Sequence, residues 1–356
     1  MVGPLPPPAG GMANQMRQLS ELLGLEKYDV HIVRTNTPYR PRWIARYKGV
    51  RAVFRLFSYL GQLWHIPGKT QVCHVLANSG MSWHLFAAPA VWAAYLKGIP
   101  VIINYRGGEA DEFFRKSFPW VRPTLNRASM ITVPSGYLAD VFEKWGIDTK
   151  IVPNIINLEL FHPRPINNPC DLLQNPHILV ARNLEPIYGV DTALYAFRSL
   201  LDEVPDARMT IAGSGPQLTA LQNLARELGI TQKLRFTGRM ENSKMAALYQ
   251  EADILLNASL VDNMPVSLLE AMASGVPIVS TSAGGIPYLV EQNKTALLVD
   301  PGDSKAMAKA LARLASNGEL RTSLIRNGLV KIERYSWSSV RNSLLDIYHS
   351  IVVPEK

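Results

Sequence analysis

The chain has 356 residues, of which 47% are hydrophobic and 19% charged, and its formal net charge is +8. This composition excludes a disordered chain and is typical of a globular protein long enough for two domains. Its only cysteines, Cys73 and Cys170, are too few and too far apart for a disulfide scaffold or a zinc site, which suits a reducing cytoplasm.

The first half of the chain alternates short apolar segments with helical ones. We expect strands at 30–33, 72–76, 101–104 and 130–133. The pair Gly10-Gly11 follows Met1 so closely that the first strand is expected to be cut short, with a few residues missing upstream. A glycine pair lets a ligand approach the backbone, so Gly11 is a candidate binding residue. The apolar stretch 81–96 is shorter than the roughly 20 residues of a spanning helix and predicts a buried helix.

Positive charge gathers in this first half. Residues 1–150 hold 18 Lys and Arg against 9 Asp and Glu, and no acidic residue lies between Asp29 and Glu109. Seven basic residues fall in the first part of that gap: Arg34, Arg40, Arg42, Arg46, Lys48, Arg51 and Arg55. Six of the seven tryptophans also lie in the first half. This pattern predicts an anionic membrane surface or a phosphorylated acceptor as partner. No nucleic-acid-binding motif accompanies the charge, so nucleic acid is not expected.

A segment rich in proline and asparagine, at 151–169, separates the halves and has the character of a linker. We expect an N-terminal domain at 1–152, a linker at 153–175 and a C-terminal domain at 176–336. The last segment, 337–356, is expected to return to the first domain.

The second half predicts a parallel sheet with helices on both faces. Strands are expected at 177–181, 208–212, 234–237, 254–257, 277–281 and 296–299. Helical patterns fall near 189–203, 216–229, 242–251, 265–274 and 303–316. Ligands of such sheets bind beyond the carboxyl ends of the strands, and the glycines Gly213, Gly215, Gly284 and Gly285 follow predicted strands there.

The most informative motif follows the fourth of these strands. Asp262 and Glu270 are separated by seven residues, and Pro265 between them suits the first position of a helix. A helix start carries unpaired N–H groups and partial positive charge, which favours a phosphate. Two carboxylates beside it can bind hydroxyl groups. The combination predicts a site for a sugar joined to a nucleoside diphosphate, whereas a helix cap and a solvated glutamate are the structural alternative.

Several motifs together resemble glycosyltransferase family four over nearly the whole chain. They are Val152–Asn154 followed by Phe161, Ala212–Pro216, Phe236–Arg239 and Leu269–Pro277. The resemblance implies an α/β chain with the GT-B fold, in which two Rossmann-like, doubly wound domains face each other across a cleft. It also implies a retaining enzyme that uses a nucleotide sugar.

The resemblance also implies roles for individual residues. Glu270 would hold the ribose hydroxyls, Asp262 would contact the transferred sugar, and Arg182 would grip the diphosphate. The remaining donor-binding residues implied or suggested are Gly11, Arg106, Gly213, Arg239, Asn263, Met264, Pro265 and Val266.

Three positions depart from the family pattern. Asp262 replaces the usual glutamate, and Tyr188 stands where the family usually has a lysine. Tyrosine donates a hydrogen bond but carries no positive charge. Arg106 replaces a common histidine and could return positive charge to the cleft.

The expected reaction is transfer of a sugar from a nucleotide-diphosphate sugar to a hydroxyl of a glycan or lipid-linked acceptor. It would belong to cell-surface polysaccharide or glycolipid synthesis, in the cytoplasm or on the inner face of the cell membrane. No metal or other cofactor is expected, because the histidines lack ligand spacing with carboxylates. The alternatives are another GT-B nucleotide-sugar enzyme of the epimerase type and a nucleotide-sugar-binding protein with impaired catalysis.

Overall fold

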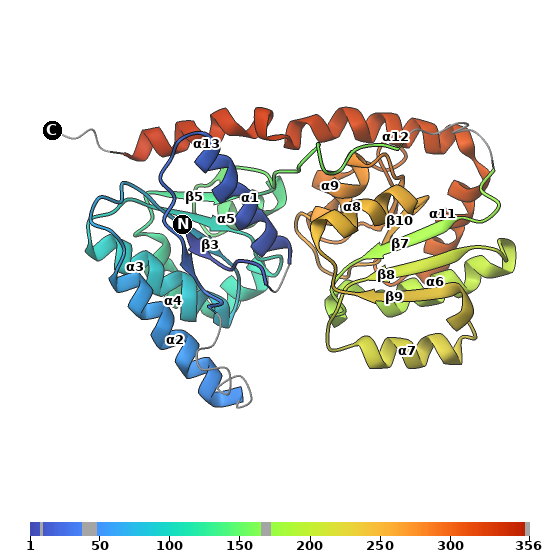
Figure 1. Cartoon of the computed structure of the whole chain (residues 1–356), viewed down its shortest axis with the longest axis horizontal. Coiled ribbons are helices and arrows are strands. Elements are labelled where there is room, and N and C mark those ends of the chain that lie inside the picture. Colours follow the sequence, from blue (N-terminus) through green and yellow to red (C-terminus); the bar gives the residue numbers. More distant parts are fainter. Residues whose placement is uncertain (8–9, 38–47, 165–171, 353–356) are drawn as a thin grey trace. The chain divides into compact units, whose positions relative to one another are not determined.

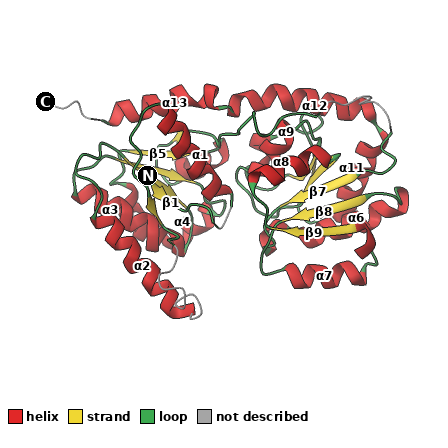
Figure 2. Cartoon of the chain, viewed as in Figure 1, coloured by secondary structure: helices red, strands yellow, loops and turns green. Residues whose placement is uncertain are grey.

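The computed structural model describes residues 1–7, 10–37, 48–164 and 172–352, without the side chains of 48–53. The chain divides into two compact units, one of residues 1–155 and 340–356 and the other of residues 156–339. Each unit is a parallel sheet flanked by helices (Figure 1, Figure 2). No helix in the described ranges is long and apolar enough to cross a membrane.

The sheet of the first unit has the strand order β2-β1-β3-β4-β5-β6. Its strands are β1 (Val2–Gly3), β2 (Val33–Arg34), β3 (Cys73–Ala77), β4 (Val101–Tyr105), β5 (Met130–Val133) and β6 (Lys150–Ile151). Three of the four strands expected here overlap the observed ones over most of their length. The expected strand 30–33 is reduced to Val33–Arg34, since only two residues of β1 are available to pair with it.

The helices of this unit are α1 (Gly11–Leu25), α2 (Lys48–Trp64), α3 (Ala88–Leu96), α4 (Ala110–Leu125), α5 (Gly136–Lys144) and α13 (Trp337–Ile351), whose first residues belong to the other unit. One core contains Val75, Ile103 and Tyr105 from the sheet together with the helices α2 to α5. The apolar stretch 81–96 forms a π-helical turn, Trp83–Ala87, that continues into α3, and Trp83 is fully buried.

The second unit has the strand order β12-β11-β10-β7-β8-β9. Its strands are β7 (His177–Ala181), β8 (Arg208–Ala212), β9 (Leu234–Gly238), β10 (Ile254–Asn257), β11 (Ile278–Thr281) and β12 (Leu297–Val299), as the apolar segments predict. This is the doubly wound order of the Rossmann fold, with the first strand at the centre and the direction of winding reversed between β7 and β10.

Helices cover both faces of this sheet. They are α6 (Val190–Glu203), α7 (Leu218–Glu227), α8 (Asn242–Glu251), α9 (Val266–Ala273), α10 (Ile286–Leu289), α11 (Ser304–Ser316) and α12 (Gly318–Ile332). Alternate strand residues enter separate cores: Ile178 and Val180 pack with α6, α7 and α11, while Leu179 and Leu255 pack with α8 and α9. Burial on both faces explains why these strands are apolar throughout.

Candidate functional site

The site of the second unit lies where the winding of the sheet reverses. Arg182 follows β7 directly, and Asp262 lies in the loop between β10 and α9. Because β7 and β10 are neighbours, these residues come from adjacent strand ends although 80 positions separate them in the sequence. Doubly wound sheets bind their ligands at this reversal, so the two strongest sequence predictions fall on one candidate site.

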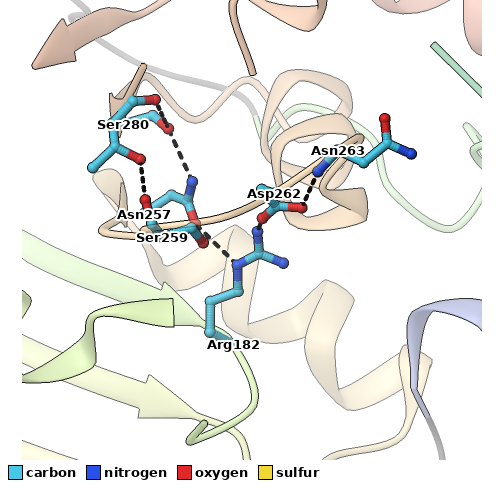
Figure 3. A network of polar contacts seen from close by, with 7 residues as sticks. Arg182, Asn257, Ser259, Asp262, Asn263 and Ser280 are labelled. Carbon is cyan, nitrogen blue, oxygen red and sulfur yellow. Dashed lines mark hydrogen bonds and ion pairs between the residues drawn. The ribbon is translucent and has the colours of Figure 1, made fainter. Parts of the chain in front are cut away.

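Arg182 and Asp262 form an ion pair through Nη2 and Oδ2 (Figure 3). Each side chain is only 11% exposed. The Nε of Arg182 also donates a 2.9 Å hydrogen bond to Oδ1 of Asn257, and its guanidinium lies 4.8 Å from the ring centroid of Tyr188. Burial lowers the pKa of Arg182, while Tyr188, Tyr249 and Glu270 act in the opposite direction. The protein thus holds a buried cation with several of its own groups.

A polar network behind Arg182 joins three strand ends (Figure 3). Nδ2 of Asn257 donates to Oγ of Ser280, and Oγ of Ser259 donates to Oδ1 of Asn257, both over 2.9 Å. Thr281 donates to the carbonyl of Ser259 over 2.6 Å. All four side chains belong to residues no more than 1% exposed. Each buried polar group is paired, which favours one fixed arrangement.

The sequence predicts Pro265 as the first residue of a helix. The helix α9 instead begins at Val266, and Pro265 is its N-cap. Proline has neither an N–H group nor a side-chain acceptor, and no side chain caps this end. Asp262 is not the cap either, because its Oδ1 accepts a 2.9 Å hydrogen bond from the N–H of Asn263. The positive end of α9 therefore has no protein carboxylate as cap, which is the arrangement that accommodates an anion.

Glu270 lies one turn into α9, where its Oε2 accepts a 2.9 Å hydrogen bond from the hydroxyl of Tyr249. The same hydroxyl donates to the carbonyl of Ser267 over 3.1 Å. Burial raises the pKa of Glu270 to about 7, although Tyr249 and Arg182 both act to lower it. A buried carboxylate with a raised pKa, close to a helix start without a side-chain cap, is a candidate acceptor for sugar hydroxyls.

Four glycines stand where two backbone segments of the site approach each other. A Cβ at Gly213 would meet the carbonyl of Arg182, and one at Gly215 would meet that of Leu184. A Cβ at Gly284 or Gly285 would meet the carbonyls of Asp262 and Asn263, respectively. Gly284 also has a left-handed φ of +52°. The glycine motifs thus have a packing reason beyond any contact with ligand.

Other predicted residues lie apart from this cluster. Arg239 follows β9 and is exposed, and among the described residues it has no hydrogen bond or ion pair. Met264 and Asn263 are buried in the loop before α9. Gly11 is the first residue of α1 in the first unit, and no side chain caps the N-terminal end of that helix.

Arg106 follows β4 in the first unit and points two of its groups at protein acceptors. Its Nε donates to Asn104 over 3.1 Å, and its Nη1 donates to Asn154 in the segment predicted as linker. Burial lowers its pKa to about 10. Asn104 in turn contacts His74, which contacts Tyr348 of α13 over 2.7 Å. Arg106 therefore belongs to a buried polar chain, and its role toward the donor stays a prediction.

Part of the predicted basic segment 34–55, residues 38–47, lies outside the described ranges. No group of three His, Cys, Asp or Glu side chains in the described ranges could hold a metal ion.

Sequence reasoning missed three residues of the site: Asn257, Ser280 and Tyr249. Asn257 and Ser280 could have been found, because they are polar residues at the ends of apolar strands that converge on one sheet edge. Tyr249 lies in α8, and no local pattern marks it as a partner of Glu270.

Two family models match the chain. "Glycosyl transferases group 1" matches residues 172–330, and "Glycosyltransferase Family 4" matches residues 9–160. The chain belongs to glycosyltransferase family four. The first of these matches contains the whole Arg182–Asp262–Glu270 cluster of this family-four chain.

Among curated relatives, the D-inositol 3-phosphate glycosyltransferase of Corynebacterium glutamicum is 32% identical over 178 residues, which are 48% of this chain and 43% of that protein. The phosphatidyl-myo-inositol mannosyltransferase of Mycobacterium leprae is 23% identical over 81% of this chain and 75% of that protein. The match to the first of these relatives thus spans less than half of its length.

Solved structures share the fold at low sequence identity. Sucrose-phosphate synthase from Thermosynechococcus elongatus superposes with a TM-score of 0.74 at 18% identity, over 96% of this chain and 94% of that one. The Anabaena protein HepE in complex with UDP-glucose gives a TM-score of 0.72 at 16% identity, over 94% and 89%. The GT-B fold that the sequence predicts is thereby confirmed.

Proposed function

We propose that this family-four chain transfers a sugar from a nucleotide-diphosphate sugar to a hydroxyl of a glycan or lipid-linked acceptor, with retention of anomeric configuration. The observation that carries the proposal is the buried Arg182 beside the uncapped start of α9. These two features supply positive charge and backbone donors at one sheet edge, where a diphosphate can bind and depart as leaving group. The fold neighbour HepE was solved with UDP-glucose, which supports this donor class.

In the proposed reaction the negative charge that develops on the departing diphosphate is stabilised by Arg182 and the N–H groups of α9, without a metal. Glu270 accepts hydrogen bonds from the ribose hydroxyls, and Asp262 orients hydroxyls of the transferred sugar. The acceptor hydroxyl attacks on the face that the phosphate leaves, and a phosphate oxygen takes its proton. The transition state has oxocarbenium character, as in glycoside hydrolysis.

The names of two relatives and the charge of the first half support a class of acceptor. Two relatives are named for D-inositol 3-phosphate and phosphatidyl-myo-inositol. The first half of this chain is basic, with no acidic residue between Asp29 and Glu109. We propose a phosphorylated acceptor, free or lipid-linked, bound by the first unit in cell-surface glycan or glycolipid synthesis.

We also propose that the first unit docks on an anionic membrane through α2. Tyr59 and Leu63 bury one side of this helix. Phe57 and Trp64, which are 70% and 79% exposed, lie on another side together with the 41% exposed Leu60. A helix with one buried face, a second apolar stripe and basic neighbours is suited to the membrane interface.

Turnover of a panel of nucleotide sugars tests the proposal. The purified chain is first screened for donors that raise its melting temperature, and each stabilising donor is then incubated with and without inositol phosphate or phosphatidylinositol. We expect a glycosylated product with the anomeric configuration of the donor, read by NMR. Donor conversion that needs no acceptor would favour the epimerase-type alternative. Stabilisation without any product would favour the binding-protein alternative.

A further inference from the structure

The guanidinium of Arg182 is held on three sides by the protein. Asn257 accepts from Nε over 2.9 Å, Asp262 pairs with Nη2, and the ring of Tyr188 lies against one face, 4.8 Å from the guanidinium carbon. Nε and Nη2 form one edge of the planar guanidinium fork. Because protein acceptors take that edge, the edge that carries Nη1 is the one left for a bound ligand.

The ring of Tyr188 is placed by backbone hydrogen bonds. Tyr188 ends a 3₁₀ turn, Pro186–Tyr188. The carbonyl of Ile187 in that turn accepts from the N–H groups of Leu260 and Val261, over 2.8 and 3.3 Å. These two residues directly precede Asp262, so the turn that carries the ring and the loop that carries the carboxylate are tied together.

The glycine after the turn strengthens this connection. Gly189 has a left-handed φ of +54°, and a Cβ there would meet the carbonyl of Ala258, which directly follows the strand that ends at Asn257. The left-handed backbone and the close approach both favour glycine at this position. The position of the Tyr188 ring relative to β10 is therefore set by the fold.

The contact of Tyr188 with Arg182 is made by the ring. The phenol hydroxyl has no hydrogen bond among the residues that the structure describes, whereas the ring faces a cation that is 11% exposed. Cation–π attraction is strongest where the cation is desolvated, as it is here.

We propose that Tyr188 is a positioning residue of the donor site: its ring holds the Arg182 guanidinium so that the Nη1 edge faces the diphosphate. This inference rests on the proposed function. It assigns a role to the residue that stands where the family usually has lysine. The site then uses a single cation, Arg182, with its orientation fixed by Tyr188, in place of an arginine and a lysine. The replacement of lysine by Tyr188 is then not a loss of function.

Binding of nucleoside diphosphates and of their nucleosides, measured by calorimetry on the full chain, tests this role. UDP, GDP and ADP are screened, and the tightest is compared with its own nucleoside. Tyr188→Leu should raise the Kd of the diphosphate five- to tenfold and leave that of the nucleoside within twofold, because only the diphosphate uses Arg182. Tyr188→Phe, which keeps the ring, should restore diphosphate binding to within twofold. Tyr195→Leu, at a 47% exposed tyrosine of α6, is the matched control.

A second comparison separates positioning from general damage. In an Arg182→Lys background, Tyr188→Leu should weaken diphosphate binding by less than twofold, because lysine has no planar face for the ring to hold.

Each contrary result overturns the inference. Equal losses for nucleoside and diphosphate would make Tyr188 merely structural, and equal losses in the Phe and Leu variants would assign its role to the hydroxyl. Unchanged diphosphate binding in Tyr188→Leu would refute this inference alone. Failure of the wild-type chain to bind any nucleoside diphosphate would refute the proposed function and this inference with it.

Discussion

The hydroxyl of Tyr249 donates a hydrogen bond of 2.9 Å to Glu270, and it does so from a helix adjacent to the one that carries the carboxylate. The bond lowers the pKa of Glu270 but does not offset burial, which raises that pKa from 4.5 to about 7. Glu270 is therefore expected to make both stability and ligand binding depend on pH near neutrality.

Glu270→Gln should stabilise the protein at high pH and not at low pH. Between pH 4.5 and about 7 the unfolded carboxyl has lost a proton that the folded one retains, so stability falls as pH rises through this window and stays lower above it. Glutamine does not ionise, and its oxygen can still accept from Tyr249. Urea denaturation at pH 5, 6, 7 and 8 should show a gain that grows with pH. A gain or loss independent of pH would contradict the raised pKa.

Removal of the Glu270 carboxylate should weaken nucleotide binding. Glu270→Ala is expected to raise the Kd for the preferred nucleoside diphosphate about tenfold, the loss of one or two charged hydrogen bonds to ribose. In the wild type the affinity should increase from pH 6 to pH 8 as Glu270 ionises, and in Glu270→Gln it should not. Calorimetry with the 2′-deoxynucleotide as control should show a smaller effect of the substitution. Unchanged binding would refute the ribose assignment.

Asp262→Asn should separate binding from turnover. Asparagine leaves the buried Arg182 without its counter-charge, and breaking a buried pair costs about 3–5 kcal/mol, so the free protein should melt at a lower temperature. A bound diphosphate then supplies the missing negative charge. We expect a larger ligand-induced rise in melting temperature than in the wild type, with turnover reduced about 10- to 100-fold. A smaller ligand-induced rise would show that the diphosphate does not supply the negative charge that Asp262 gives to Arg182.

Gly284→Ala should damage the site as well as the fold. Both Gly284 and Gly229 have a left-handed backbone, with φ of +52° and +69°. A Cβ at Gly229 meets no atom within 4 Å, whereas one at Gly284 meets the carbonyl of Asp262. Gly229→Ala should therefore cost only the left-handed strain of about 1–2 kcal/mol. Gly284→Ala should cost more and also raise the Kd for nucleoside diphosphate. Equal effects of the two variants on binding would show that the Asp262 loop tolerates displacement.

Serine substitutions on α2 should release the chain from anionic vesicles. The double variant Phe57→Ser and Trp64→Ser removes two exposed apolar side chains without touching the buried Tyr59 and Leu63. Flotation with vesicles of phosphatidylglycerol and phosphatidylcholine should show binding of the wild type and at least a fivefold loss in the variant. Trp120→Ser on α4 is the control, since Trp120 is 79% exposed, as is Trp64. Equal recovery with pure phosphatidylcholine would contradict an electrostatic contribution.

Most regular elements of the second unit follow directly from the sequence, whereas the helices α10 and α12 were not predicted. The apolar runs that become β7 to β12 are short, continuous and bounded by glycine, proline or charged residues, and the helices between them carry a helical period. These are local signals, and burial on both faces makes them strong. In the first unit the signal is weaker, and strand β2 is displaced because its partner β1 has only two residues.

The side chains that make up the candidate site were only partly predictable. Arg182, Asp262 and Glu270 stand out because each lies at a predicted strand end or helix start and matches a family motif. Asn257 lies at a predicted strand end but in no family motif, and Tyr249 carries neither mark. Their roles depend on which strands are neighbours and on how α8 packs beside α9, and neither is encoded in local spacing.

The contact between Asp262 and Arg182 separates what the sequence determines from what only the tertiary structure determines. By itself the sequence determined the parallel, doubly wound sheets and the start of α9. It also determined that two carboxylates and an arginine lie near strand ends. These features are predictable because hydrophobic periodicity, helix start and stop residues and family motifs are local properties of the sequence. Only the tertiary structure decided that β7 lies beside β10 and that Arg182 pairs there with Asp262 and lies against Tyr188. The physical reason is that these contacts join residues up to 80 positions apart, and their geometry is fixed by strand order and packing.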